Sequence, residues 1–231
     1  MLDRMQVMAQ EELQHKMLVE RTEYKMLQAQ INPHFLYNTL EGIRSEALIA
    51  GLDSIAEMTE ALATFFRYTI SNLENLVTLE DELANIENYY YIQQFRFGSK
   101  LDLKIQYDRD PDDDFTEMDF LQCKLPKLTL QPIVENSVNH GIREMNGEGK
   151  IQLKVYHVDG DTLGISIRDN GIGMDRDTIE KVLGGNYHEE QSGGGSNGIA
   201  MGNIIARLKL FTQNEDVMTI LSDGKNQGTE V

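Results

Sequence analysis

Along the first 97 residues, apolar positions recur at helical spacing and are rarely interrupted. Residues 1 to about 30 contain no Gly or Pro, which favours a long helix. Its apolar seam is imperfect, so both a coiled coil and a solvated helix fit it. Pro33 is expected to bend the helix axis, because a proline inside a helix removes a hydrogen bond. The helical pattern then resumes and, after a break at Gly51, continues over 53–73.

A further helix is predicted to begin at Thr78, a good N-cap residue that is followed by three acids in the first turn. Its apolar stripe recurs at spacings of four, three and four residues, at Leu79, Leu83, Ile86 and Tyr90. The first 97 residues are therefore expected to be all-helical, with apolar faces that need partner helices.

The hydrophobic period changes after Phe97-Gly98. The residues from Leu101 to Tyr107 alternate between apolar and polar, as in a strand, and an acidic loop over 108–114 follows. The remaining pattern next predicts a helix over 126–142, followed by a hairpin of strands 150–158 and 162–169 joined by Asp159-Gly160. An irregular glycine-rich stretch over 184–198 then leads into a helix over 199–213. A last hairpin is predicted from strand 217–222 and a strand that starts at residue 228. Mixed strands with segregated helices indicate an α+β fold, in which helices pack on one face of a sheet.

Charge and composition narrow the classes of function. The 231 residues include 38 acids and 21 bases, for a formal net charge of −17. Such a surface repels a nucleic-acid backbone, so we expect no nucleic-acid partner. Cys123 is the single cysteine, which excludes an intrachain disulfide and a cysteine-rich zinc site. No apolar run of about 18 residues and no signal peptide occur in the sequence.

Both ends of the chain look cut. It starts within a helical pattern and stops at Gly228-Thr229-Glu230-Val231, which has the composition of the first residues of a strand. We therefore expect the final strand to be truncated, and a membrane anchor could lie upstream.

The first of four segments with candidate chemistry is Q-I-N-P-H-F-L-Y-N-T, residues 30–39. A lone histidine on a helix is far more often a core or surface residue than a functional one. Neutral imidazole is nevertheless a suitable nucleophile for phosphoryl transfer, because one ring nitrogen can attack while a neighbour orients the other. His34 is therefore a candidate phosphoacceptor.

The second segment is L-Q-P-I-V-E-N-S-V-N-H-G, residues 130–141. On a helix, Asn136, Asn139 and His140 share one face, and Glu135 lies close beside it. Amide and carboxylate oxygens suit Mg²⁺, which must bridge the phosphates of ATP, so Asn136 and Glu135 are candidate metal ligands. A polar helix face over the core would explain the same pattern.

The third segment, D-N-G-I-G-M, directly follows a predicted strand. A carboxylate at Asp169 can accept a hydrogen bond from the amino group of adenine. Gly171 and Gly173 allow positive φ and a close approach of the backbone to a ligand, up to Met174 at the end of the segment. As an isolated turn, this motif is weak evidence.

The fourth segment, G-G-G-S-N-G-I-A-M-G-N over 193–203, enters a helix. Glycines before a helix expose amide groups at the positive end of the helix dipole, which suits a phosphate. Residues 175–197 could thus form a lid over a nucleotide, although a plain linker fits the same composition. The segment is neither a P-loop nor a dinucleotide fingerprint, because no strand feeds it and no G-K-[ST] follows.

Together and in this order, the four segments resemble the motifs of the sensor histidine kinases of the LytS/YesM type. I-N-P-H-F-L-Y-N-T-L is similar to the phosphoacceptor box of that family, L-Q-P-I-V-E-N to its N box, and D-N-G-I-G-M and G-I-A-M-G-N to its two glycine boxes. The resemblance covers nearly all of the chain from about residue 25. It implies a signalling helix or coiled coil over 1–29, a dimerising helical hairpin over 30–97 that carries His34, and an ATP-binding α/β sandwich of the GHKL (Bergerat) type over 98–231.

The resemblance also implies roles for individual residues. Asn136 would hold Mg²⁺, and Asp169 would bind adenine in a pocket shaped by Gly171 and Gly173. Further contacts with the nucleotide are implied for Asn139, His140, Met174, Gly198, Gly202, Asn203 and Thr229.

The activity implied by the resemblance is a protein-histidine kinase that uses ATP and Mg²⁺. Its implied partners are a second copy of the chain, the receiver domain of a response regulator and an upstream sensor. We expect the chain to be the cytoplasmic portion of a membrane-anchored bacterial sensor.

Three departures from the family pattern stand out. Asn139 replaces a Lys that family members often have, so a charge that neutralises phosphate is missing, unless Arg143 or His140 compensates. Ala200 replaces a usual Gly, and the last strand is incomplete.

The residue after the phosphoacceptor histidine also departs from the pattern of many histidine kinases, in which this residue is an acid. Phe35 occupies that position here, so Glu135 is the candidate group to orient or deprotonate His34. Asn38, one helical turn after His34, is a candidate for positioning water in dephosphorylation of a partner.

Two other functions fit part of the sequence. A GHKL-type ATPase that uses Glu135 to activate water explains the nucleotide motifs, but it does not explain N-P-H-F-L-Y-N on a helical hairpin. A degenerate dimeric scaffold is supported only by Asn139 and Ala200.

Overall fold

The computed structural model describes residues 33–71, 76–108, 116–142, 147–159, 162–183 and 196–231. The helix predicted over 1–30, the bend predicted at Pro33, most of the acidic loop and most of the predicted lid depend on residues outside these ranges. The chain divides into two compact units, Met1–Ser71 and Asn72–Val231. Among the described helices, none combines the length and the hydropathy needed to cross a bilayer.

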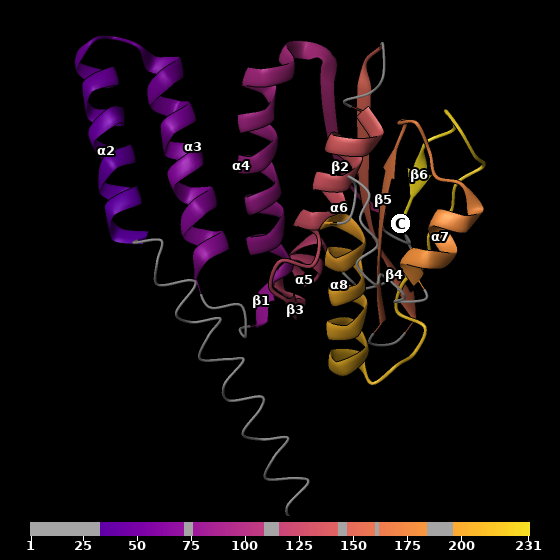
Figure 1. The fold of residues 1–231 in the computed structure, drawn as a ribbon. Coiled ribbons are helices and arrows are strands. Elements are labelled where there is room, and N and C mark those ends of the chain that lie inside the picture. The colour runs from indigo at the N-terminus through magenta and orange to yellow at the C-terminus, as the bar shows by residue number, and fades with distance from the viewer. Residues whose placement is uncertain (1–32, 72–75, 109–115, 143–146, 160–161, 184–195) are drawn as a thin grey trace, which may run out of the picture. The chain divides into compact units, whose positions relative to one another are not determined.

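The first unit is a helical hairpin of α2 (Pro33–Ile49) and α3 (Asp53–Ile70), with a turn at Gly51, whose φ is 68° (Figure 1). Small and aliphatic side chains form its buried seam: Leu40, Ala47, Ala56, Ala61 and Ala63. Both predicted helices are confirmed. The second ends at Ile70 rather than at residue 73, because Ser71 is already extended.

The second unit begins with β1 (Leu76–Thr78) and α4 (Leu79–Phe97). The Thr78 hydroxyl accepts a hydrogen bond from the Asp81 amide at 3.2 Å, and the Asp81 carboxylate accepts one from the Thr78 amide at 3.1 Å. This reciprocal capping box starts α4 and confirms Thr78 as the N-cap. A 3₁₀ turn, Gly98–Lys100, follows the helix.

A four-stranded mixed sheet forms one layer of this unit, in the order β2-β4-β5-β6. Its strands are β2 (Leu101–Asp108), β4 (Gly149–Asp159), β5 (Thr162–Asp169) and β6 (Thr229–Glu230). β2 and β4 are parallel, whereas β4–β5, the predicted hairpin, and β5–β6 are antiparallel. One face buries alternate side chains of β4 and β5: Ile151, Leu153, Val155 and Ile167.

The second layer is helical. α4, α6 (Gln131–Asn136) and α8 (Ser196–Thr212) lie on the same side of the sheet (Figure 1). The predicted α+β arrangement, with helices on one face of a sheet, is therefore confirmed.

Four short elements differ from the sequence prediction. They are β1, β3 (Lys124–Pro126), which pairs with β1, α5 (Glu117–Gln122) and α7 (Arg176–Leu183). Three to eight residues are too few to show a periodic pattern, and the β1–β3 pairing joins distant parts of the chain.

Two predicted elements are corrected. The helix expected over 126–142 starts only at Gln131, because the residues before it form β3 and an irregular loop, and it ends in a π-helical turn, Ser137–Ile142. The strand expected over 217–222 is reduced to a single bridge between Leu221 and Glu230.

α4 belongs to the second unit, where it contacts β2, α5 and α6. The stripe of Leu79, Leu83 and Ile86 is at most 4% exposed, so the apolar face of α4 is used within the sheet-containing unit.

Candidate functional site

A small, partly open cavity lies in the second unit, between the end of α6, the turn after β5 and the C-terminal strand. Its wall consists mainly of apolar side chains with a few polar ones: Ile133, Asn136, Ser137, Gly141, Asp169, Ile172, Gly173, Met174, Met201, Thr229 and Val231. Such a composition is typical of sites for small organic ligands. Three of the four sequence segments therefore contribute to one cavity.

The π-helical turn after α6 decides which residues face this cavity. In a π turn the backbone bonds join residues five apart, so the set of residues on one face differs from that of an α-helix. Asn136 and Ser137 line the cavity together with Gly141, whereas Asn139 does not. π turns within α-helices are frequent at functional sites.

Asp169 is the buried acid of the cavity, with an exposed fraction of 6%. Its Oδ2 accepts a hydrogen bond from the Ser137 hydroxyl at 2.9 Å, and its Oδ1 accepts one from the Gly171 amide at 2.8 Å. Burial raises the pKa of Asp169, and hydrogen bonds from Gly171, Ser137 and Thr229 oppose this shift. A carboxylate has lone pairs for more than these donors, so Asp169 can also accept from a ligand N–H.

The turn after Asp169 is packed too closely for side chains. A Cβ on Gly171 would lie 2.3 Å from the Cα of Gly141, and a Cβ on Gly173, whose φ is 73°, would lie 2.1 Å from the carbonyl oxygen of Gly224. The Ile172 amide donates to the Gly141 carbonyl at 3.0 Å. Glycine at these two positions thus allows the turn to lie between the π-helical turn and the C-terminal segment.

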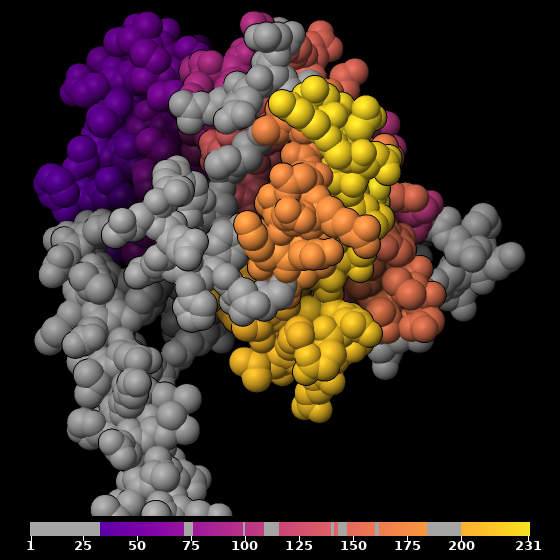
Figure 2. Space-filling model, turned by 45° about the vertical axis from the view of Figure 1, so that its right-hand side comes forward, coloured from indigo at the N-terminus to yellow at the C-terminus, as the bar shows by residue number. Residues whose placement is uncertain are grey.

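The C-terminal segment completes the wall. Thr229 pairs with Asp169 in the sheet and is 7% exposed. The Gly228 amide donates to the Gly171 carbonyl at 3.0 Å, and the Met174 amide donates to the Ser222 hydroxyl at 3.0 Å. α7 and this segment lie side by side on one face of the unit (Figure 2).

A buried acid on α4 organises the loop that precedes α6. Glu82 is 1% exposed, and its carboxylate accepts hydrogen bonds from the amides of Leu128 at 2.6 Å, Thr129 at 2.9 Å and Leu130 at 2.9 Å. Leu130 is the N-cap residue of α6, and its own side chain does not cap the helix. Glu82 therefore supplies the negative charge that the N-terminus of α6 favours.

Arg207 on α8 contacts the same loop from the other side. Its guanidinium donates to the carbonyl oxygens of Lys127 at 2.6 Å and Leu128 at 2.7 Å. Leu128 is held in a left-handed conformation, with φ 55°. Burial lowers the pKa values of Lys127 and Arg207, and the charge of Glu82 opposes this shift for both. The loop is thus fixed between α4 and α8.

Glu135 lies on the side of α6 that faces α4. Its Oε1 accepts a hydrogen bond from the Gln131 amide group at 2.6 Å, and Gln131 accepts one from Asn85 of α4. Glu135 does not belong to the cavity wall, whereas the next residue, Asn136, does.

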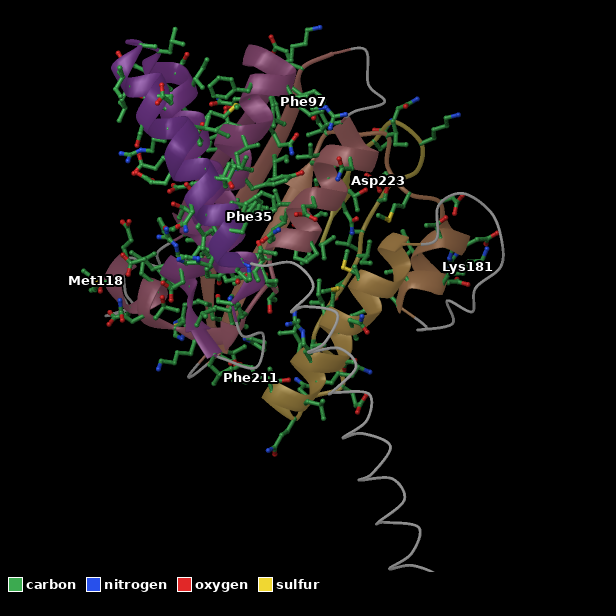
Figure 3. All side chains as sticks on the ribbon, turned by 60° about the vertical axis from the view of Figure 1, so that its left-hand side comes forward. Phe35, Phe97, Met118, Lys181, Phe211 and Asp223 are labelled. Carbon is green, nitrogen blue, oxygen red and sulfur yellow. The ribbon has the colours of Figure 1, made fainter. Side chains whose placement is uncertain are left out.

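His34 lies in the first turn of α2 in the first unit and is exposed. The side-chain nitrogen of Asn38 lies 3.3 Å from each of the two ring nitrogens of His34. Phe35, the next residue, is 69% exposed (Figure 3). The imidazole is therefore accessible and has one polar neighbour that can orient it.

The structure brings together five of the predicted nucleotide residues on the cavity wall: Asn136, Asp169, Gly173, Met174 and Thr229. Gly171 adjoins the wall through Asp169. Gly202 and the exposed Asn203 lie on α8 outside the wall, Gly198 falls in the first turn of α8, and the side chain of His140 is outside the described part of the structure. Within the described ranges, no group of three or more His, Cys, Asp or Glu could hold a metal ion.

Several wall residues were not predicted from the sequence. Ile133, Ile172 and Met201 follow ordinary apolar patterns, and nothing local distinguishes them from core residues. Ser137 directly follows the predicted Asn136, but its role as a donor to Asp169 depends on a contact across 32 positions.

Comparison with known proteins agrees with this arrangement. The family model described as histidine kinase matches residues 22–101, and that of the histidine kinase-, DNA gyrase B-, and HSP90-like ATPase matches residues 126–231. Sensor histidine kinase YesM of Bacillus subtilis is 33% identical over 210 residues, which are 91% of this chain and 33% of that protein. Sensor protein LytS of Oceanobacillus iheyensis is 32% identical over 210 residues, 87% of this chain and 34% of that protein.

The chain thus spans about a third of the length of these curated relatives. Among solved structures, the histidine kinase domain of the blue-light activated histidine kinase of Erythrobacter litoralis EL346 aligns with a TM-score of 0.45 at 15% identity, over 85% of this chain and 92% of that one.

Proposed function

Because this chain belongs to the sensor histidine kinases and contains their ATPase-type domain, we propose that it autophosphorylates His34 from ATP and Mg²⁺ and passes the phosphate to an aspartate of a response regulator. One observation carries the proposal. Asn136, Asp169 and Thr229 come from three distant segments and line a single cavity, in a chain that also presents an exposed histidine on a helical hairpin.

Adenine binds, in this proposal, against the carboxylate of Asp169. The amino group of adenine donates to an oxygen of Asp169, while the amide of Gly171 and the hydroxyl of Ser137 hold that carboxylate in place. The apolar wall around it, including Met201, excludes water from the ring. The phosphates extend toward Gly198, Gly202 and Asn203 at the N-terminal part of α8, where the helix dipole favours negative charge.

Mg²⁺ fits the amide oxygen of Asn136 best. Mg²⁺ is usually bound by one or two protein oxygens together with water and substrate phosphates, and Asn136 supplies such an oxygen on the cavity wall. When bound, the ion would neutralise charge on the phosphates. Glu135 suits this role less, because its carboxylate lies off the wall and is held by Gln131. We propose instead that Glu135 accepts a proton from His34.

Phosphoryl transfer then needs little from the protein beyond position and charge. One ring nitrogen of His34 attacks the γ-phosphorus with its lone pair, and the bond from that phosphorus to the bridging oxygen breaks. ADP leaves with the bonding electrons. The proton on the other ring nitrogen of His34 passes to the carboxylate of Glu135.

The phosphate leaves His34 in the reverse sense. A carboxylate oxygen of an aspartate on the response regulator attacks phosphorus, the N–P bond breaks with its electrons returning to the ring nitrogen, and the ring takes up a proton from water to become neutral imidazole again. Asn38, which lies 3.3 Å from both ring nitrogens, is placed to orient the ring or a water for dephosphorylation of the partner.

A second copy of the chain is the partner proposed for the helical hairpin. Apolar side chains that are at least 40% exposed are numerous on and between α2 and α3: Phe35, Ile43, Leu48, Ile49, Leu52 and Ile55. Burial of such side chains in a dimer is favourable. Because the chain spans a third of its sensor relatives, we further propose an upstream sensor with a membrane anchor, and a cytoplasmic place for this portion.

The proposal is tested with ATP labelled at the γ-phosphate, in the presence of Mg²⁺. We expect the protein to acquire a label that is stable in base and labile in acid, as a phosphorylated imidazole is. Free labelled phosphate without an adduct would favour an ATPase that uses Glu135 to activate water. No nucleotide binding at millimolar concentration would favour a scaffold.

A further inference from the structure

Arg67 places a positive charge across the helical hairpin, over the first turns of α2. It lies in the last turn of α3 and is exposed. Its Cζ lies 5.4 Å from the centre of the Tyr37 ring on α2, within the range of a cation–π interaction. The Tyr37 hydroxyl lies 3.5 Å from the carbonyl oxygen of Phe66, so Tyr37 faces this end of α3. The guanidinium of Arg67 is thus held against α2.

The surrounding hairpin is acidic, and its other arginine is already neutralised. The acids and arginines of residues 33–71 are Glu41, Glu46, Asp53, Glu57, Glu60, Arg44 and Arg67. Arg44 pairs with Glu41 at 3.0 Å and with Glu60 at 3.4 Å. Among the described residues, Arg67 has an aromatic ring rather than a carboxylate as its neighbour. The dipole of α3 favours a cation in its last turn, but it does not explain why the side chain lies across on Tyr37.

His34 lies on the face of α2 to which Arg67 reaches. His34, Tyr37, Asn38 and Glu41 share that face, because residues three and four apart are neighbours on a helix. Tyr37 follows His34 by three residues, which is about 4.5 Å along the helix axis. Both ring nitrogens of His34 lie 3.3 Å from the side-chain nitrogen of Asn38, so the imidazole leans toward the turn that carries Tyr37. The guanidinium and the imidazole therefore occupy neighbouring places on one face.

We propose that Arg67 binds the phosphoryl group that His34 acquires, an inference that rests on the proposed role of His34 as phosphoacceptor. A phosphoryl group brings negative charge and three acceptor oxygens to this face. The planar guanidinium is always charged, and it can donate two parallel N–H bonds to two of these oxygens. Arg67 has only to leave the Tyr37 ring, because a cation–π contact at an exposed site is weaker than a charge-assisted pair with phosphate.

Arg67 forms and breaks no covalent bond in this scheme. It lowers the free energy of the phosphorylated hairpin relative to the unphosphorylated one. Without its charge, the phosphoryl group would be surrounded by the carboxylates of the hairpin, which repel it. The equilibrium between ATP with free His34 and ADP with phosphorylated His34 therefore depends on Arg67.

The test measures this equilibrium in the full chain. The protein is incubated with γ-labelled ATP and Mg²⁺ at a series of fixed ratios of ATP to ADP, until the label on His34 no longer changes. In Arg67→Met, we expect the ratio of phosphorylated to free His34 to fall about tenfold at each nucleotide ratio, as for loss of a hydrogen bond to a charged group. Arg67→Lys keeps the charge without the planar fork, so its ratio should fall less.

Arg44→Met is the matched control, because it removes the other arginine of the hairpin. Its ratio of phosphorylated to free His34 should equal that of the wild type. The affinity for ADP, measured by calorimetric titration, should be the same in all these proteins, since neither arginine lies on the cavity wall. A variant that only slows phosphorylation reaches the wild-type ratio later, so the end point separates binding of the phosphoryl group from an effect on rate.

The ³¹P resonance of phosphorylated His34 gives a second readout that a purely structural role would not change. We expect the resonance to shift in Arg67→Met and to stay in place in Arg44→Met. Urea unfolding of each variant shows whether the hairpin is intact under the conditions of the assay.

Three results would overturn the inference while labelling of His34 still stands. They are a wild-type ratio and resonance in Arg67→Met, a fall of the ratio that only follows the urea midpoint, and an equal fall in Arg44→Met. Absence of label from the wild-type protein would instead overturn the proposed function, and this inference with it.

Discussion

At the scale of single residues, Asp169 meets two opposing requirements. It is buried in the cavity wall, and the proposed binding of adenine requires it to be ionised so that it can accept strong hydrogen bonds. The Gly171 amide and the Ser137 hydroxyl offset part of the cost of burying the charge. The remaining cost is visible as a pKa of Asp169 above its ordinary value.

Asp169→Asn should therefore separate binding from stability. We expect ATP to bind about 10- to 100-fold more weakly, because a hydrogen bond to a charged group contributes about 1.5–3 kcal/mol. Calorimetric titration with ATP and Mg²⁺ measures this loss. Asp223→Asn, an exposed acid outside the cavity wall (Figure 3), should bind as wild type. Equal affinities for Asp169→Asn and wild type would contradict the role of Asp169.

The same substitution changes how stability depends on pH. The raised pKa of Asp169 means that the folded state holds this proton to higher pH than the unfolded state does. Stability associated with Asp169 is thus lost as pH rises from its ordinary pKa through the raised one. At pH 7 the urea midpoint of Asp169→Asn should equal or exceed that of the wild type, and its advantage should shrink toward pH 4.

The carboxylate of Glu82 holds the loop that precedes α6, through hydrogen bonds from three backbone amides. Glu82→Gln leaves one of three amide donors facing an NH₂ group and leaves Lys127 and Arg207 without their counter-charge. We expect the free energy of unfolding to fall by about 3 kcal/mol, as for removal of one partner from a buried ion pair. Urea unfolding followed by circular dichroism measures it. Glu87→Gln, on the exposed face of α4, is the control, and equal midpoints for both variants would refute the argument.

At the scale of elements, the site depends on a turn that no side chain can enter. Gly171→Ala would place a Cβ 2.3 Å from Gly141, so the turn after β5 and the π-helical turn must separate. We expect weaker ATP binding and a loss of about 1–3 kcal/mol in unfolding free energy, as for other overpacked sites. An Ala variant with wild-type binding and stability would show that the two turns move apart at no cost.

Gly202→Ala on α8 is the counterpart of Gly171→Ala at a position where a Cβ has room. No atom lies within 4 Å of the added Cβ, and glycine is unfavourable inside a helix. This variant should be more stable by about 0.5–1 kcal/mol. Any loss of ATP affinity in it would then report contact with the ligand rather than damage to the fold.

Elements with several turns of clear periodicity could be predicted from the sequence. α2, α3, α4 and the β4–β5 hairpin all occur close to the predicted bounds. β1, β3 and α5 could not be predicted, because so short a segment gains its conformation from tertiary contacts. The π-helical turn was missed for a related reason, since its sequence fits an α-helix equally well.

The site could be predicted only where motifs carry local chemistry. Asp169 and Asn136 stand in recognisable segments and both reach the cavity wall. Glu82 and Arg207 did not stand out, because their contacts with residues 127–130 span from 46 to 80 positions. A buried acid in an apolar helical stripe has no local signal that separates it from an exposed one.

At the scale of the whole molecule, α4 decides where the chain can be divided. Leu79, Leu83 and Ile86 are buried in the sheet-containing unit, and together contribute about 5–8 kcal/mol. A fragment 72–231 should therefore unfold cooperatively in urea and bind ATP, whereas 98–231 should do neither. If 98–231 folded and bound ATP as well as the longer fragment, α4 would not belong to the folding unit.

The most direct test concerns the acceptor of the phosphate. The full chain is incubated with γ-labelled ATP and Mg²⁺, alongside His34→Ala and the control His157→Ala, which alters a histidine of β4. We expect an acid-labile, base-stable label on wild type and His157→Ala and only background on His34→Ala. Label that persists on His34→Ala would contradict the assignment of His34 as the phosphoacceptor.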